Sequence, residues 1–146
     1  MILAMPSVGG MAPVGSVNVW MAWIDHILNK NELRLTNVAI VHQQTGAVAA
    51  SNRQFQLSSQ DIQNIQMAFP YNGVNVEIDR VVLQSCTYIV ISTTNHSMVA
   101  FNGNKYLIVV KSKRMFIVAI CASRSKSKEA ADWLNSLRLK LIRNGY

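Results

Sequence analysis

Histidine and cysteine are the side chains in this sequence best suited to catalysis or metal binding, and they are few and scattered. The histidines are His26, His42 and His96, and the cysteines are Cys86 and Cys121. No pair has a metal-ligand spacing, and no nucleophile motif or phosphate-binding glycine loop accompanies them. Both cysteines lie in hydrophobic runs, which favours buried reduced thiols over a disulfide. The sequence therefore predicts a protein that is not an enzyme and uses no cofactor or metal.

A pair of tryptophans is better suited to binding. Trp20 and Trp23 lie about one helical turn apart in the stretch NVWMAWIDHIL, in a chain with three tryptophans. Ile24 and Ile27 belong to the same stripe and can supply a core by themselves. Grouped exposed aromatic side chains mark contact sites more often than single ones do. The pair is therefore either core between helices or a surface for a ligand, and both interpretations stay open.

Positive charge is the third chemical feature. The formal net charge is +7, from 14 Lys and Arg against 7 Asp and Glu, and most of the excess lies between residues 105 and 143. Such a field favours an acidic protein face, an anionic lipid headgroup or nucleic acid, although a solvated surface explains it equally well. Tyr88, Tyr106 and Phe116, the rings that could stack on bases, lie inside apolar strands. We therefore expect no nucleic-acid partner.

Hydrophobic periodicity predicts the elements that position these groups. Helices are expected at 18–30, 58–69 and 127–146, and strands at 37–43, 46–52, 79–93, 97–103, 105–113 and 114–123. Asn18, Ser58 and Ser127 are the predicted N-caps, with Asp61 completing a capping box, and Asn72 and Gly73 mark a turn. The short connections between the later strands favour antiparallel pairing.

The expected fold is α+β, with a central antiparallel sheet of about six strands. The amino- and carboxyl-terminal helices are expected on one face and the remaining helix on the other. The domain is predicted to span residues 18–146, preceded by a flexible extension at 1–17. No run reaches the roughly 18 apolar residues of a membrane span, and the opening segment lacks a basic signal region. These features predict a cytoplasmic protein.

Several motifs occur in an order that resembles a divergent profilin. The stretch from Trp20 to Ile27 is similar to the family's first helix. Further similarities follow at 39–41, at Gly46, at 55–61 and at 88–91, and the chain ends in Gly-Tyr. The resemblance covers about residues 18–146 and implies a cytoskeletal protein that binds monomeric actin, or an actin-like protein, and regulates polymerisation.

The resemblance also implies two binding surfaces. A proline-rich peptide would lie between the terminal helices. Its predicted contacts are Trp20, Trp23, Leu141 and Tyr146. Ala49 and Lys140 replace a tryptophan and a histidine of the family pattern, so weak or altered peptide binding is expected. The predicted actin contacts are Val90, Ser92, Tyr106, Lys111, Lys126 and Lys128. The same cationic surface could hold an anionic phosphoinositide.

Two further hypotheses concern the whole chain. The main alternative is a roadblock-like or longin-like dimeric scaffold for a GTPase or a trafficking partner, because those domains also wrap helices around an antiparallel sheet. The profilin interpretation instead predicts a monomer. The methionine, proline and glycine content of residues 1–17 motivates the hypothesis that this extension covers the peptide groove and competes with the ligand.

Overall fold

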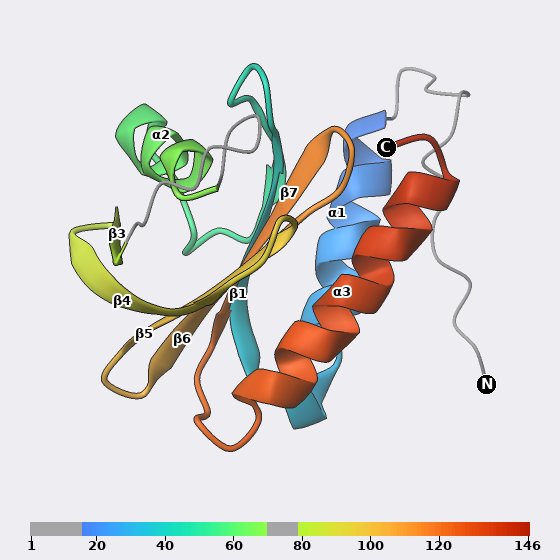
Figure 1. Cartoon of the computed structure of the whole chain (residues 1–146). Coiled ribbons are helices and arrows are strands. Elements are labelled where there is room, and N and C mark those ends of the chain that lie inside the picture. Colours follow the sequence, from blue (N-terminus) through green and yellow to red (C-terminus); the bar gives the residue numbers. More distant parts are fainter. Residues whose placement is uncertain (1–15, 70–78) are drawn as a thin grey trace.

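The structure is a computed structural model that describes residues 16–69 and 79–146. The described residues form one antiparallel sheet of seven strands with the order β2-β1-β7-β6-β5-β4-β3 (Figure 1). The strands are β1 (Leu35–His42), β2 (Val48–Ser51), β3 (Arg80–Leu83), β4 (Cys86–Thr93), β5 (Ser97–Asn102), β6 (Lys105–Lys111) and β7 (Met115–Cys121). The helices are α1 (Ser16–Leu28), the short 3-10 helix η1 (Asn31–Leu33), α2 (Ser59–Met67) and α3 (Ser127–Arg143).

Helices cover both faces of this sheet. Helices α1 and α3 lie side by side on one face, and α2 lies on the other face (Figure 1). Every residue of β7 is buried, because this central strand has a helix layer on each side. Its continuous apolar sequence is what a strand covered on both faces requires. The predicted α+β fold, with the terminal helices on one face, is therefore confirmed.

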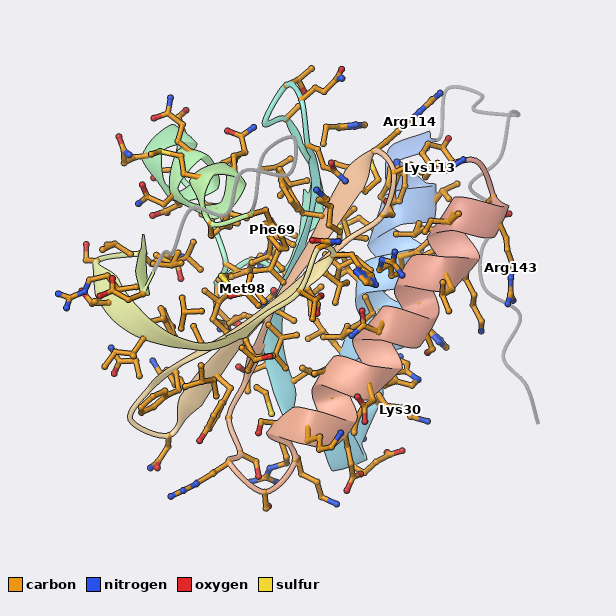
Figure 2. All side chains as sticks on the ribbon, viewed as in Figure 1. Lys30, Phe69, Met98, Lys113, Arg114 and Arg143 are labelled. Carbon is orange, nitrogen blue, oxygen red and sulfur yellow. The ribbon has the colours of Figure 1, made fainter. Side chains whose placement is uncertain are left out.

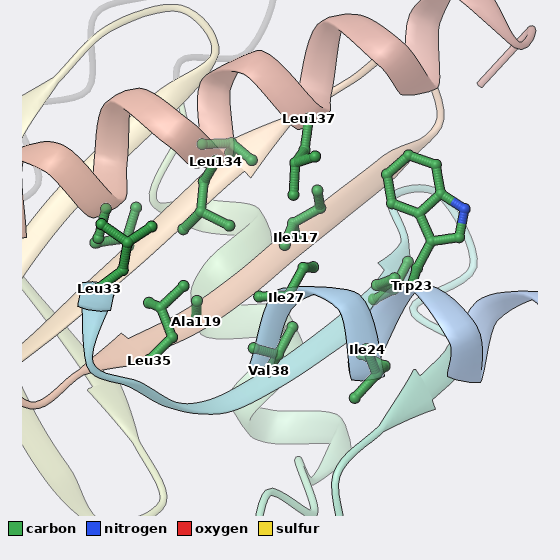
Figure 3. Packing of buried hydrophobic residues seen from close by; sticks show 14 of the residues in the cluster. Trp23, Ile24, Ile27, Leu33, Leu35, Val38, Ile117, Ala119, Leu134 and Leu137 are labelled. Atoms are coloured by element: carbon green, nitrogen blue, oxygen red, sulfur yellow. The ribbon is translucent and has the colours of Figure 1, made fainter. Parts of the chain in front are cut away.

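Two hydrophobic clusters fill the spaces between the layers. The α1–α3 cluster lies between the terminal helices and the sheet, and it contains Trp23, Ile24, Ile27, Leu134 and Leu137 together with alternate residues of the central strands (Figure 3). The α2 cluster lies on the opposite face and contains Phe55, Ile62, Ile65, Phe69, Phe116 and their strand neighbours. Alternate residues of β1, β6 and β7 enter opposite clusters, as the strand period of two dictates.

Helix α2 begins with the predicted capping box. The Ser58 hydroxyl accepts a hydrogen bond from the Asp61 backbone N–H at 3.1 Å, and the Asp61 carboxylate accepts one from the Ser58 N–H at 3.0 Å. The same carboxylate accepts a second bond, from the Gln84 N–H at 3.0 Å in the turn between β3 and β4. Asp61 is therefore buried with all of these groups satisfied, and it joins the helix to the hairpin.

The structure corrects three predictions about the elements. The predicted strand at 79–93 is a hairpin, because Gln84 and Ser85 have positive φ angles of 50° and 64° and form a tight turn. The sheet therefore has seven strands rather than about six. Helix α1 begins at Ser16, so Asn18 lies inside the helix and not at its N-cap. Ser127 is the first residue of α3, and its hydroxyl donates to the Arg124 carbonyl instead of capping the helix.

Strand β4 contains a β-bulge that matters for the surface described below. Val90 pairs with Ala100 and Ser92 pairs with Val99, so the register shifts by one residue between them. Val90 packs against the α2 cluster, whereas Val99 packs against the α1–α3 cluster. The bulge therefore changes which side chains of β4 lie on each face.

Other features of the described residues agree with the composition. None of the helices there is long and apolar enough to cross a membrane. Cys86 and Cys121 are free thiols, and Cys121 is buried. The predicted Asn72-Gly73 turn and most of the predicted extension, residues 1–15, lie outside the described residues.

Candidate binding surfaces

An aromatic platform lies where α1 begins and α3 ends. It consists of Trp20 and Tyr146, whose ring centroids are 5.3 Å apart with an interplanar angle of 84°. Both side chains are half-buried, because each packs against the α1–α3 cluster with one side. This edge-to-face geometry is a favoured arrangement of aromatic pairs, and it keeps part of each ring in contact with solvent. Two of the four residues predicted to contact a peptide are thus brought together.

The other two predicted peptide contacts are structural. Trp23 and Leu141 are each 0% exposed and belong to the α1–α3 cluster. Neither can touch a ligand without a rearrangement of the core, so they support the platform from below. Ala49, which replaces a ring of the family pattern, is half-buried beside the same cluster. Of the two interpretations of the tryptophan pair, core therefore holds for Trp23, whereas Trp20 lies at the surface.

Backbone hydrogen bonds hold Tyr146 in place. Its carbonyl oxygen accepts a bond from the Ser112 hydroxyl at 2.7 Å and one from the Arg114 N–H at 2.6 Å. Ser112 and Arg114 belong to the turn between β6 and β7, which is therefore fixed directly against the platform. Gly145 has a φ of 91°, a conformation that glycine adopts readily, and it lets the chain turn back after α3. No pattern in the sequence predicts these contacts.

The six predicted actin contacts do not form one surface. Val90 packs against the α2 cluster, and the Lys111 ammonium lies 5.6 Å from the Phe69 ring on that same face. Tyr106 belongs to the α1–α3 cluster on the opposite face and is only 7% exposed. Ser92 is exposed and, through its pairing with Val99, lies on the α1–α3 side. The sheet itself therefore separates Val90 and Lys111 from the rest.

The two lysines at the start of α3 are paired with acids of the same helix. The Lys126 ammonium lies 3.6 Å from the Glu129 carboxylate, and the Lys128 ammonium lies 3.3 Å from that of Asp132. These exposed pairs contribute little to stability, but each reduces the free positive charge at this site. Lys126 and Lys128 are thus less suited to hold an anionic headgroup than the sequence indicates.

An exposed apolar patch on β3 and β4 was missed by the sequence analysis. Val82, Ile89 and Ile91 are 42%, 52% and 55% exposed. Ile89 pairs directly with Phe101, which packs against the α1–α3 cluster, so this outer apolar patch lies on the α1 and α3 side of the sheet. Strands β3 and β4 curl away from α3, which leaves the patch uncovered (Figure 1). The alternation within YIVIS was the available signal, since it places both isoleucines on one face.

A second feature missed by the sequence analysis lies between the terminal helices. The Trp133 ring is 5.7 Å from the His26 ring, and the Lys30 ammonium is 5.6 Å from the Trp133 centroid. Burial lowers the pKa of His26, and the positive charges of Lys140 and Lys30 lower it further. This contact joins α1 to α3 at some distance along the helices from the platform.

The described residues contain nothing that resembles a catalytic centre. No group of three or more His, Cys, Asp or Glu among them could hold a metal ion. Burial raises the pKa of the Cys121 thiol, which disfavours the reactive thiolate.

Comparison with known proteins identifies the family to which these surfaces belong. The family model described as Profilin matches residues 18–146. A crystallised profilin of Schizosaccharomyces pombe has 25% identity and a TM-score of 0.73, and the match covers 87% of this chain and 99% of that one. Comparison with curated proteins gives no match.

Two solved complexes share the fold. LokiProfilin1 in complex with rabbit actin has 17% identity and a TM-score of 0.65, with 81% of this chain and 90% of that one covered. Mouse profilin IIa in complex with a double repeat from the FH1 domain of mDia1 has 16% identity and a TM-score of 0.55, with 83% and 97% covered. The predicted resemblance is confirmed, and the scaffold alternative is set aside.

Proposed function

Because the chain belongs to the profilin family, whose members are not enzymes, we propose that it binds monomeric actin or an actin-like protein and regulates its polymerisation. The protein acts as a cytoplasmic monomer in association with the cytoskeleton. It sequesters or delivers monomers by binding alone, and no covalent bond is made or broken.

The outer apolar patch is the observation that carries this proposal. Val82, Ile89 and Ile91 are apolar side chains left uncovered beside a helix layer, and exposed apolar groups of this kind mark protein contact sites. Ser92 belongs to the same face and extends the surface along β4. The row of paired residues that begins at Ile89 crosses the sheet to Cys121, just before α3. The start of α3 therefore lies at the far end of this row, three strands away from Ile89.

The charges around this surface suit an acidic partner in a limited way. Lys126 and Lys128 lie at the start of α3, where their carboxylate partners reduce the field. Apolar contact then supplies most of the affinity, and the lysines speed the encounter.

Nucleation of actin tests the proposal. The purified protein is titrated into fluorescently labelled monomeric actin under polymerising conditions, and we expect the nucleation lag to lengthen with dose. The double variant Ile89→Asp/Ile91→Asp should lose the effect, because it places two charges in the apolar contact. Met67→Asp is the matched control, since Met67 is 68% exposed on α2 and outside the proposed surface. A double variant that is folded by circular dichroism and still lengthens the lag would overturn the assignment.

A second function concerns proline-rich peptides, and the platform favours it. Trp20 and Tyr146 present ring surface between the terminal helices, and aromatic rings bind preformed polyproline II segments at low entropic cost. Only two rings contribute, so we propose weak binding. Trp20→Ala should abolish the change in tryptophan fluorescence that a proline decamer produces. The same variant should leave actin nucleation unaffected, which separates the two functions.

A further inference from the structure

A recess lies beside the platform, between the β1–β2 turn and the β6–β7 turn. Its volume is about 460 Å³, within the range of ligand-binding pockets. We call it the turn pocket, and it is lined by His42, Gln43, Gln44, Thr45, Lys113 and Arg114. Every one of these side chains is polar or charged.

Hydrogen bonds make the frame of the turn pocket rigid. The Gln43 side-chain amide donates to the Ser112 carbonyl at 2.7 Å and to the Met115 carbonyl at 2.9 Å. The Gln43 backbone N–H donates to the Arg114 carbonyl at 2.9 Å, which joins the two turns directly. On the other side, the Gln66 side chain donates to the Gln43 carbonyl at 2.6 Å. The pocket is therefore organised before any ligand arrives.

Among the described residues, the two cations of the turn pocket belong to no ion pair, a property that they share with Lys105, Arg124 and other basic residues. Lys30, Arg80, Lys126 and Lys128 each lie within 4.0 Å of a carboxylate, whereas the ion pairs among the described residues do not include Lys113 or Arg114. Both of these side chains are exposed. They lie at the end of the molecule where α3 finishes, far from Lys30 (Figure 2). The positive charges of Lys113 and Arg114 are therefore not neutralised by an ion pair within the described part of the chain and are available to an acidic ligand.

The turn pocket and the platform share a residue contact. The Arg114 backbone N–H donates to the Tyr146 carbonyl, so a residue that lines the pocket is hydrogen-bonded to a residue that carries a platform ring. A chain lying on the platform therefore reaches the pocket within a few residues, since polyproline II advances about 3.1 Å per residue.

We propose that the turn pocket binds the acidic side chains that flank the proline run of a peptide seated on the Trp20–Tyr146 platform. Carboxylates beside the prolines accept hydrogen bonds from Lys113 and Arg114, and the guanidinium can bind one of them in a bidentate manner. This inference rests on the proposed peptide function and specifies its partner. The ligand is a proline-rich segment with adjacent glutamate or aspartate residues.

A membrane surface fits the turn pocket less well than a peptide does. Stable attachment to a membrane combines basic residues with an apolar anchor or a lipid chain. The exposed side chains at the tips of the two turns, Gln44, Thr45, Lys113 and Arg114, include no apolar group. Within residues 16–69 and 79–146, the apolar feature joined to the pocket by a hydrogen bond is the platform, and its two rings suit an extended peptide.

Three synthetic peptides test the proposal. They are a proline decamer, the same decamer with two glutamates added at each end, and the same decamer with two lysines added at each end. At low salt we expect the glutamate peptide to bind about three- to ten-fold more tightly than the plain decamer, because exposed ion pairs are individually weak. The lysine peptide should bind more weakly than the plain decamer. Calorimetry or tryptophan fluorescence measures each affinity.

Charge reversal then assigns the effect to the turn pocket. Lys113→Glu/Arg114→Glu should reverse the order of the glutamate and lysine peptides and leave the plain decamer nearly unchanged. Lys105→Glu/Arg124→Glu is the matched control, because it removes the same charge from exposed sites outside the pocket. An unchanged preference for glutamate in the pocket variant overturns the proposal.

Two more outcomes separate this proposal from its neighbours. If the plain decamer fails to bind, the peptide function itself is wrong, and the actin assay is unaffected. A fourth probe is a phosphatidylcholine vesicle containing an anionic phosphoinositide. If the pocket variant loses vesicle binding while the peptides show no preference by charge, the pocket is a lipid site and the proposal is overturned.

Discussion

Trp20 and Trp23 show how one helical turn divides two identical side chains. A step of three residues rotates the side-chain direction by about 300°, which leaves the two rings about 60° apart around the helix axis. Trp23 points into the α1–α3 cluster and is 0% exposed, while Trp20 reaches Tyr146 at the end of the helix. Trp23 therefore contributes to stability, and Trp20 is available to a ligand.

His26 is another residue whose surroundings give it a definite property. It lies between the two terminal helices against Trp133, and the charges of Lys30, just after α1, and of Lys140 in α3 act on it. Burial and these two positive charges lower its pKa below the ordinary value of 6.5. His96 has a lowered pKa for the same kinds of reason, namely burial and the charges of Arg138 and Lys111.

Stability should fall as the pH drops below about 6.5. Between the lowered pKa of the folded protein and that of the unfolded chain, the unfolded chain binds more protons, so acid favours unfolding. Urea denaturation at about pH 7.5 and about pH 5.5 measures the loss. His26→Gln should lose less stability over this interval than the parent protein does. Equal losses in the two proteins would show that His26 does not contribute.

Single residues also mark how far sequence reasoning reaches. Trp20 and Tyr146 could be placed together because both belong to a family pattern at the two ends of the domain. The exposure of Ile89 and Ile91 could not be predicted from alternation alone, since it depends on how far β3 and β4 curl away from α3. The hydrogen bonds that fix Tyr146 come from the β6–β7 turn, which is distant from it in sequence.

At the scale of elements, Asp61 joins α2 to the β3–β4 hairpin. Its carboxylate accepts hydrogen bonds from Ser58 at the helix start and from Gln84 in the turn. The Asn64 side chain adds a bond to the Val82 carbonyl at 2.9 Å. Helix α2 therefore contributes to the geometry of the strands that carry the outer apolar patch, although it lies on the opposite face of the sheet.

Asp61→Ala should lower the free energy of unfolding by about 1–3 kcal/mol, because it removes an N-cap interaction and leaves the Gln84 N–H without its acceptor. Denaturation followed by circular dichroism measures this change. Gln63→Ala is the control, since Gln63 is an exposed residue of the same helix. A loss no larger than that of the control would contradict the assigned role.

The elements themselves were largely predictable from the sequence, and the hairpin was the main exception. The capping box of α2 and the apolar stripes of the terminal helices are local signals, and the structure confirms them. The turn at Gln84 and Ser85 has positive φ angles without glycine or asparagine, the residues that normally announce such a turn. Because apolar residues alternate both before and after this turn, the sequence predicts one long strand at 79–93.

At the scale of the whole molecule, one sheet separates two hydrophobic clusters. Trp20, Trp23 and Trp133 all lie in or against the α1–α3 cluster, while the α2 cluster contains none of the tryptophans. Strands β1, β6 and β7 contribute side chains to both. The tryptophans therefore report on one face of a structure whose other face can be altered separately.

Ile65→Ala should reduce the free energy of unfolding by about 2–5 kcal/mol, because Ile65 is 1% exposed in the α2 cluster. If the shared strands make unfolding cooperative, the transition seen by tryptophan fluorescence shifts as much as that seen by circular dichroism. Met67→Ala, at an exposed site of the same helix, should change either transition by less than about 0.5 kcal/mol. A fluorescence transition that did not move would show that the two faces unfold independently.

The length of α3 sets the distance between the two proposed ligands. Its 17 residues span about 26 Å, with the proposed actin contacts Lys126 and Lys128 at its start and the aromatic platform at its end. If both proposed sites are used, one molecule holds a monomer and a proline-rich segment together without either blocking the other. A proline-rich segment anchored on a larger assembly then raises the effective concentration of monomers at that assembly. Helix α3 then acts as a rigid spacer between the bound monomer and the proline-rich segment.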